Sequence, residues 1–163
     1  MPVTLPPALP ATRWRRPIRL ALAVALVLPA LAWAAAVLAV WLAQERLLFR
    51  PVPLPPDAPL STEPDVHERF VDVPGARLSV LELRRPAPDG VVFFLHGNND
   101  NLKTWFTGGE LYRRLNFDLV MMDYRGFGKS TGRIASQAQL MDDVDAVWRS
   151  VQARYAGKPV VAY

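Results

Sequence analysis

Residues 91–99 read Val-Val-Phe-Phe-Leu-His-Gly-Asn-Asn, and residues 118–132 read Asp-Leu-Val-Met-Met-Asp-Tyr-Arg-Gly-Phe-Gly-Lys-Ser-Thr-Gly. In both stretches a continuous apolar run ends in a polar turn that contains glycine. Such runs are typical of parallel strands that are covered on both faces. Because ligands and catalytic groups gather at the carboxyl ends of parallel strands, these two turns mark the expected functional edge of an α/β sheet.

The segments around these two strands extend the pattern. Residues 68–73 and 77–83 alternate polar and apolar positions, and the Pro-Gly turn signal at 74–75 predicts that they form an antiparallel hairpin. The stretch 102–115 is expected to be helical in part, because the glycines at 108–109 weaken its first half.

A clearer helix follows the second apolar strand. Ser136 and Gln139 form a capping box, and apolar residues recur at helical spacing as far as Tyr155. Gly157 is expected to cap this helix, and residues 160–163 are expected to open another buried strand. An antiparallel start followed by alternating strands and helices predicts an α/β fold with right-handed crossovers.

The amino-terminal third has the composition of a membrane segment. Residues 20–43 contain no charged residue, and as a helix they would span about 36 Å, enough to cross a hydrocarbon core of about 30 Å. Pro29 interrupts the run, which a membrane helix tolerates. Four arginines and no acidic residue precede it, namely Arg13, Arg15, Arg16 and Arg19. The positive-inside rule therefore predicts a single-pass anchor with a cytoplasmic amino terminus and the following domain on the extracytoplasmic side.

A cleaved signal peptide is the alternative interpretation of the same segment. Ala32-Trp33-Ala34 fits the small-residue cleavage pattern after a basic region. Cleavage there would leave a strongly apolar new terminus, Ala-Ala-Val-Leu-Ala-Val-Trp-Leu. An uncleaved anchor is therefore favoured.

These features divide the chain into a cytoplasmic tail (1–19), a transmembrane helix (20–43), a linker (44–64) and a partial α/β domain (65–163). Six of the 14 residues at 51–64 are proline, which predicts a stiff extended spacer that lifts the domain off the bilayer.

Composition narrows the classes of function. The four arginines before residue 20 account for the net charge of +4, since the other 15 of the 19 Lys and Arg balance 15 Asp and Glu. A neutral domain gives no support to nucleic-acid binding. The absence of cysteine excludes a disulfide framework and thiolate chemistry. The two histidines, His67 and His96, lack the spacing of a metal site, so no metal is predicted.

The chain resembles the α/β-hydrolase superfamily, specifically its membrane-anchored serine-aminopeptidase-like branch, over residues 70–163. The resemblance rests on two motifs in order, His-Gly-Asn-Asn at 96–99 and Asp-Tyr-Arg-Gly-Phe-Gly-Lys-Ser at 123–130. It implies the amino-terminal part of an α/β-hydrolase sheet that ends before the nucleophile elbow. It implies no cofactor.

The resemblance also implies roles for the first motif. The backbone amide of Asn98 would donate to the oxyanion hole, which stabilises the negative charge of the tetrahedral intermediate in acyl transfer. Gly97 would permit the backbone conformation that aims this amide, and His96 would order the loop by hydrogen bonding. His96 is not expected to be the catalytic base, because the triad of these enzymes runs Ser, then Asp or Glu, then His.

The letters of the nucleophile motif, G-x-S-x-G, occur at 128–132. A nucleophilic Ser must lie on a sharp turn that runs directly from a strand into a helix. Here the strand is expected to end near Asp123 and the helix to begin near Ser136, so Ser130 lies in a long loop and is not expected to be the nucleophile. A phosphate-binding loop is also disfavoured, because it requires glycine where position 123 is Asp.

The leading interpretation is the amino-terminal portion of a membrane-anchored serine hydrolase that acts on ester, amide or acyl groups of small molecules or peptides. The nucleophile, acid and base are expected to be absent from these 163 residues, so the chain as it stands is expected to be inactive. Arg125 and Lys129 are expected to pair with nearby carboxylates or to line the mouth of the site. Two alternatives stay open, a non-enzymatic membrane-anchored pseudo-hydrolase that binds a partner and a nucleotide-binding α/β domain. The bilayer, contacted through residues 20–43, is the predicted partner.

Overall fold

The computed structural model describes residues 15–163, and the chain divides into two compact units between Gln44 and Glu45. The first unit holds most of helix α1 (Arg15–Leu48). Large apolar side chains along α1 are exposed, and the helix is long and apolar enough to cross a membrane from Pro17 to Leu48, a property that a signal sequence near the amino terminus would share. Most of the predicted tail at 1–19 lies outside the described residues.

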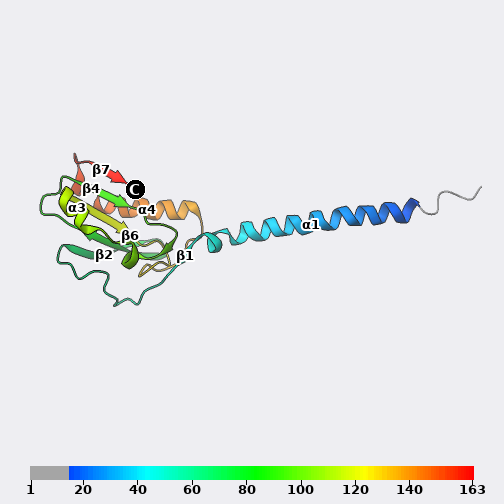
Figure 1. Cartoon of the computed structure of the whole chain (residues 1–163), viewed down its shortest axis with the longest axis horizontal. Coiled ribbons are helices and arrows are strands. Elements are labelled where there is room, and N and C mark those ends of the chain that lie inside the picture. The colour runs from blue at the N-terminus through cyan, green and yellow to red at the C-terminus, as the bar shows by residue number, and fades with distance from the viewer. Residues whose placement is uncertain (1–14) are drawn as a thin grey trace, which may run out of the picture. The chain divides into compact units, whose positions relative to one another are not determined.

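The second unit is built on a five-stranded sheet with the order β2-β3-β6-β4-β7 (Figure 1). Its strands are β2 (Val66–Val73), β3 (Ala76–Leu83), β4 (Gly90–Phe94), β6 (Phe117–Met122) and β7 (Val160–Ala162). β2 and β3 form an antiparallel hairpin, and β3 is also antiparallel to β6. β4 runs parallel to both β6 and β7, so the connection from β6 to β7 passes β4.

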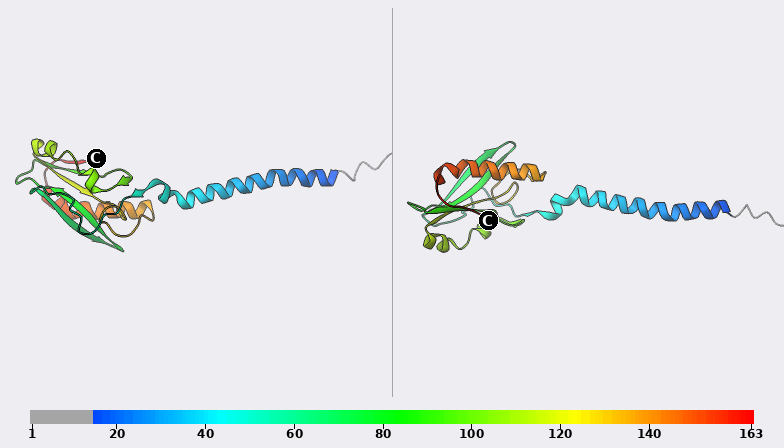
Figure 2. Two further views of the ribbon diagram at one scale, coloured as in Figure 1. Left: turned by 60° about the horizontal axis from the view of Figure 1, so that its bottom comes forward. Right: turned by 90° about the horizontal axis from the view of Figure 1, so that it is seen from above.

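Helices cover both faces of this sheet (Figure 2). α4 (Gln137–Val151) lies on one face and continues into a 3-10 turn, η1 (Gln152–Tyr155). α2 (Leu102–Trp105) and α3 (Gly109–Leu115) lie on the other face. This arrangement confirms the α/β fold that the sequence predicts.

The two faces carry separate apolar cores because successive strand residues point to opposite sides. The core beneath α4 includes Leu78, Val80, Val91, Phe93, Val120, Met122, Val147 and Val151. The core beneath α2 and α3 consists of Leu81, Leu83, Leu102, Leu119 and Met121. Both faces of β3 and β6 are therefore buried, which explains the continuous apolar run in β6.

Glu82 lies fully buried in β3 among three arginines. Its Oε1 accepts from Arg69, and its Oε2 accepts from Arg84 Nε at 2.7 Å and from Arg154 Nη2 at 2.8 Å. Burial alone would raise the pKa of Glu82, but the three guanidinium groups together outweigh it and hold the pKa below its ordinary value. We call these four residues the Glu82 cluster.

The start of α4 confirms the predicted capping box. Ser136 Oγ accepts from the Gln139 N–H at 3.2 Å. Gln139 Oε1 in turn accepts from the Ala135 N–H at 2.9 Å, one residue before the position a capping box usually uses.

The prediction that 102–115 is helical in part is confirmed, whereas the predicted end of the next helix needs correction. The stretch 102–115 forms two short helices, since Gly108 adopts a left-handed conformation (φ 72°) between them. The predicted end at Gly157 is wrong, because α4 ends at Val151 and the chain tightens into η1 before Gly157 (φ 76°) reverses it.

The proline-rich linker is not a free spacer over its first residues. β1 (Arg50–Pro51) pairs in parallel with β5 (Asn99–Asp100), and an isolated bridge joins Pro53 to Gly128. Prolines occupy alternate positions here, so all the remaining N–H groups point to one side of the extended chain. That side faces the domain, and the edge that lacks donors faces away.

Candidate functional site

The parallel strands β4, β6 and β7 end at one edge of the sheet, and the loops after β4 and β6 form the candidate site. We call residues 96–101 the β4 loop and residues 123–132 the β6 loop. Tyr163, directly after β7, lies beside the first of them, because the Leu95 N–H donates to the Tyr163 carbonyl at 2.7 Å. The Tyr163 ring also packs against Phe94, with centroids 5.1 Å apart. Three strand ends therefore meet around the β4 loop.

Asn98 is exposed at the tip of this edge. Its carbonyl accepts from the Arg50 N–H at 2.8 Å, and its side-chain Nδ2 donates to the Leu48 carbonyl at 2.7 Å. Within residues 15–163 its own backbone N–H donates to no acceptor. The loop thus fixes the Asn98 peptide through its other polar groups and leaves the amide that sequence analysis singles out available to a ligand.

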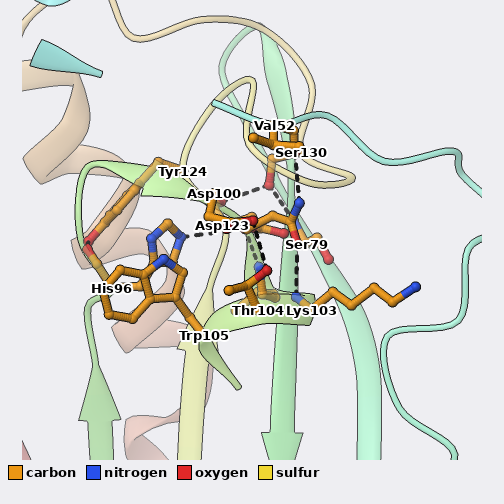
Figure 3. Close-up of polar contacts among 12 residues, drawn as sticks. Val52, Ser79, His96, Asp100, Lys103, Thr104, Trp105, Asp123, Tyr124 and Ser130 are labelled. Atoms are coloured by element: carbon orange, nitrogen blue, oxygen red, sulfur yellow. Dashed lines mark hydrogen bonds and ion pairs between the residues drawn. The ribbon is translucent and has the colours of Figure 1, made fainter. Parts of the chain in front are cut away.

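His96 is a buried residue of the β4 loop, and it contacts Gly97, Trp105 and Tyr124 (Figure 3). Its Nδ1 lies 2.8 Å from the Gly97 carbonyl, a contact that requires the proton on Nδ1. The indole of Trp105 stacks on the imidazole at 6.0 Å and 20°. Tyr124 donates its O–H to the His96 carbonyl at 2.9 Å. These contacts give His96 a loop-ordering geometry, and its side chain has no access to solvent.

Gly97 is required by this packing. A Cβ at position 97 would lie 2.9 Å from Trp105 Cζ2, closer than side-chain atoms tolerate. Trp105 Nε1 also donates to the Asn99 carbonyl at 2.8 Å, so the indole braces the loop on both sides of Asn98.

Asp123 is fully buried at the carboxyl end of β6 and is only partly satisfied. Its Oδ1 accepts from the Leu102 N–H at 2.9 Å and lies 3.4 Å from His96 Nε2 without forming a hydrogen bond to it. Its Oδ2 has no partner in the part of the chain that the structure describes. A Cβ on Gly128 would lie 1.9 Å from that oxygen, so Gly128 is the residue that admits the carboxylate.

Ser130 is buried, and its hydroxyl is fully used by the backbone (Figure 3). Its Oγ accepts from the Ser79 N–H at 2.8 Å and donates to the Asp123 carbonyl at 2.7 Å. A nucleophilic hydroxyl must be exposed on a strand-to-helix turn. The geometry therefore gives Ser130 a structural role that joins β3 to the β6 loop.

The two basic residues of the β6 loop form ion pairs, as the sequence suggested. Arg125 makes a buried bidentate pair with Asp143 of α4, with Nε and Nη2 at 2.6 and 2.8 Å from the carboxylate oxygens. Lys129 Nζ lies 2.8 Å from Glu68 Oε2. Burial raises the pKa of Tyr124 to about 12, so its phenol stays neutral and keeps its hydrogen bond to the β4 loop at ordinary pH.

Sequence reasoning missed the bracing residues Trp105 and Tyr124, and it did not place Asp123 against the start of α2. The one available signal was an Asp directly after a fully apolar strand, a position where a carboxylate must find a backbone donor. Among residues 15–163 no group of three or more His, Cys, Asp or Glu could hold a metal ion.

A family model described as serine aminopeptidase, S33, matches residues 86–163. The chain is 32% identical to alpha/beta hydrolase domain-containing protein 17B of Xenopus laevis over 89 residues, 52% of this chain and 30% of that protein. It is 37% identical to the uncharacterized protein YfhR of Escherichia coli K12 over 71 residues, 42% of this chain and 25% of that protein. The matched segments thus span less than a third of these relatives.

Solved structures align over a larger share of this chain. An α/β serine hydrolase from Xanthomonas campestris covers 64% of this chain and 52% of its own, at 22% identity and a TM-score of 0.49. A serine hydrolase homologue from Coxiella burnetii covers 59% of this chain and 50% of its own, at 20% identity and a TM-score of 0.45.

Proposed function

The chain belongs to the α/β-hydrolase superfamily, and from this premise we propose that it supplies the oxyanion-binding part of a membrane-anchored serine hydrolase. The reaction is acyl transfer from an ester, amide or other acyl substrate to water. The Asn98 amide holds the developing oxyanion, and Gly97 and His96 keep that amide aimed.

The free Asn98 N–H at the carboxyl edge is the observation that carries the proposal. It sits on the loop beside Tyr163, so a residue that follows β7 emerges next to it. A nucleophile on that turn would therefore attack a carbonyl whose oxygen points at Asn98, which is the arrangement that acyl transfer requires.

The nucleophile, acid and base of this proposal lie outside residues 1–163. The matched relatives are more than three times as long as the matched segments, which leaves room for all three groups. The buried, doubly bonded hydroxyl of Ser130 supports placing the nucleophile elsewhere. The 163-residue polypeptide alone is then inactive.

Fluorophosphonate labelling tests this division of the site. The intact protein should label, the 163-residue polypeptide should not, and Ser130→Ala in the intact protein should label as the wild type does. Loss of labelling in Ser130→Ala would make Ser130 the nucleophile and overturn the proposal. An intact protein that never labels would instead favour the pseudo-hydrolase alternative.

Two substitutions at one position test the role of the Asn98 amide. Asn98→Pro removes the backbone N–H, and loss of one oxyanion donor should lower kcat by about 100- to 1,000-fold. Asn98→Ala keeps the N–H and should retain most of the activity. Equal activities in two folded variants would remove Asn98 from the oxyanion hole.

The membrane part of the proposal is a single crossing by α1 with the amino terminus in the cytoplasm. The arginines before residue 20 and the apolar, exposed surface of α1 support it. Reporter fusions near residue 10 and after Tyr163 should fall on opposite sides of the membrane. A cytoplasmic carboxyl-terminal reporter would contradict the orientation, and a mature chain that begins at Ala35 would establish a signal peptide.

A further inference from the structure

Residues 49–54 follow α1 directly and contact both loops of the candidate site, and we call them the clip. The N–H groups of Arg50, Val52 and Leu54 and the Val52 carbonyl bond to residues that lie about fifty or more positions later in the chain. The clip therefore joins the end of the apolar helix to the site by backbone contacts, without an intervening spacer.

The clip holds the β4 loop on the carboxyl-terminal side of the candidate oxyanion amide. The Arg50 N–H donates to the Asn98 carbonyl at 2.8 Å, and the pairing of β1 with β5 continues along Asn99 and Asp100. Asp100 has a left-handed backbone (φ 68°), which is strained for a residue other than glycine. Such a conformation persists only where its surroundings fix it, and the clip is one of those surroundings.

The same segment holds the β6 loop. The Val52 carbonyl accepts from the Gly128 N–H at 3.1 Å and from Asn101 Nδ2 at 2.9 Å, so a single carbonyl ties the two loops together. The Leu54 N–H donates back to the Gly128 carbonyl at 2.7 Å. Phe49 packs edge-on against Phe127, with centroids 6.4 Å apart.

We propose that the clip is a positioning element for the oxyanion loop, and that the backbone N–H of Arg50 is its central contact. This inference rests on the proposed function of Asn98. The clip touches no reacting atom, so it acts by fixing the peptide between Gly97 and Asn98 in the conformation that presents the amide. An alternative is that the clip only stabilises the domain as a whole.

The test compares two substitutions at Arg50 in the intact, membrane-inserted protein. Arg50→Pro removes the N–H that bonds to Asn98, whereas Arg50→Ala removes only an exposed side chain and keeps the N–H. Amide hydrogen exchange is read in peptides from the β4 loop and from α4. Ester hydrolysis is measured as kcat and KM separately.

Arg50→Pro should speed exchange in the β4 loop by about 5- to 10-fold and leave α4 unchanged, since one hydrogen bond that closes the loop locally is lost. It should lower kcat and leave KM within about twofold, because the misplaced amide acts on the transition state. Arg50→Ala should match the wild type in both measurements.

Exchange that rises equally in the β4 loop and α4 would show a general brace and overturn the inference. Unchanged exchange in the β4 loop would do the same. A wild-type protein without hydrolytic activity would count against the proposed function alone, because the exchange measurement still decides whether the clip positions the loop.

Asn101→Asp serves if Arg50→Pro does not fold. Aspartate keeps the oxygen that accepts from the Lys103 N–H at the start of α2 but lacks the donor to Val52. We expect faster exchange in both loops, by about threefold, with α4 unchanged. Exchange like that of the wild type would overturn the inference as well.

Discussion

The Glu82 cluster and the β6 loop each bury a carboxylate completely, but the two carboxylates differ in how many partners they have. Glu82 contacts three guanidinium groups, which arrive from β2, from the residue that follows β3 and from η1. Asp123 accepts one backbone hydrogen bond on Oδ1 and leaves Oδ2 without a partner in the described chain.

The contrast extends to the residues around each acid. Within residues 15–163, three buried side-chain polar atoms lack a hydrogen-bond partner, and two of them, His96 Nε2 and Asp123 Oδ2, lie at the carboxyl edge. Native folds satisfy nearly all buried polar groups, so such exceptions concentrate where structure serves something besides stability. The Glu82 cluster therefore stabilises the fold, whereas the carboxyl edge contains buried polar atoms that no group in the described chain satisfies.

Removing the charge of Glu82 should have the largest effect on stability. Glu82→Gln leaves three arginines around a neutral amide, and breaking a buried ion pair costs about 3–5 kcal/mol. Urea unfolding in detergent micelles measures the free energy of unfolding. Glu110→Gln breaks the exposed pair with Arg114 and should cost less than about 0.5 kcal/mol. Similar costs for the two variants would show that the cluster is not a stability element.

Filling the space beside Asp123 should come next. Gly128→Ala adds strain at φ 48° and a methyl group against Asp123 Oδ2, so we expect a loss of about 2–4 kcal/mol. Gly108 also has a positive φ, 72°, but a Cβ added there meets nothing within 4 Å. Gly108→Ala should therefore lower the free energy of unfolding by about 1 kcal/mol. If thermal melting shows equal losses, contact with Asp123 is not what demands glycine at 128.

Acidification should lower the free energy of unfolding by protonating Glu82. The loss should be smaller than that caused by Glu82→Gln. The pKa of Glu82 is lower in the folded chain than its ordinary value of 4.5. Its stabilisation is therefore fully present above pH 4.5 and is lost as the pH falls through the folded value. The hydrogen bond from Arg113 lowers the pKa of Asp65 in the same direction. Urea midpoints between pH 7 and 3 should consequently fall less for Glu82→Gln than for the wild type, and parallel curves would contradict this.

Neutralising Asp123 should have the smallest effect on stability. An Asn side chain at 123 can still accept from the Leu102 N–H, and no Lys or Arg loses a partner. Asp123→Asn should therefore change the free energy of unfolding by less than about 1.5 kcal/mol. A loss as large as that of Glu82→Gln would mean that Asp123 is a structural acid and would remove the contrast between the two regions.

The fold was largely accessible from the sequence because its signals are local. Alternation in β2 and β3, the apolar run of β6 and the Ser136 cap each depend on residues close together in the chain. The prediction that Ser130 is not the nucleophile also depends on local signals, since the distance from strand end to helix start does not fit an elbow. The contacts that brace the site could not be predicted from the sequence, because Trp105, Tyr124 and Leu102 meet His96 and Asp123 only in the folded chain.

The clip shows why one local signal can fit two structures. The proline content of Arg-Pro-Val-Pro-Leu-Pro predicts a spacer, although the alternation of prolines leaves donors at every second residue. That pattern fits an edge strand as well as an extended linker. Only the acceptors at Asn98, Asp100 and Gly128 distinguish the two, and they are encoded far away.

The contacts of the clip also determine where a soluble form of the protein should begin. A soluble form that begins at residue 65, the boundary that composition suggests, would discard the Phe49 ring from its place against Phe127 and strip the β4 and β6 loops of their shared carbonyl. A form that begins at Glu45 retains every one of these contacts and discards the apolar unit alone. Crystallisation and anchor-exchange chimeras should use the second boundary, since the apolar helix is separable from the α/β domain only on the upstream side of the clip.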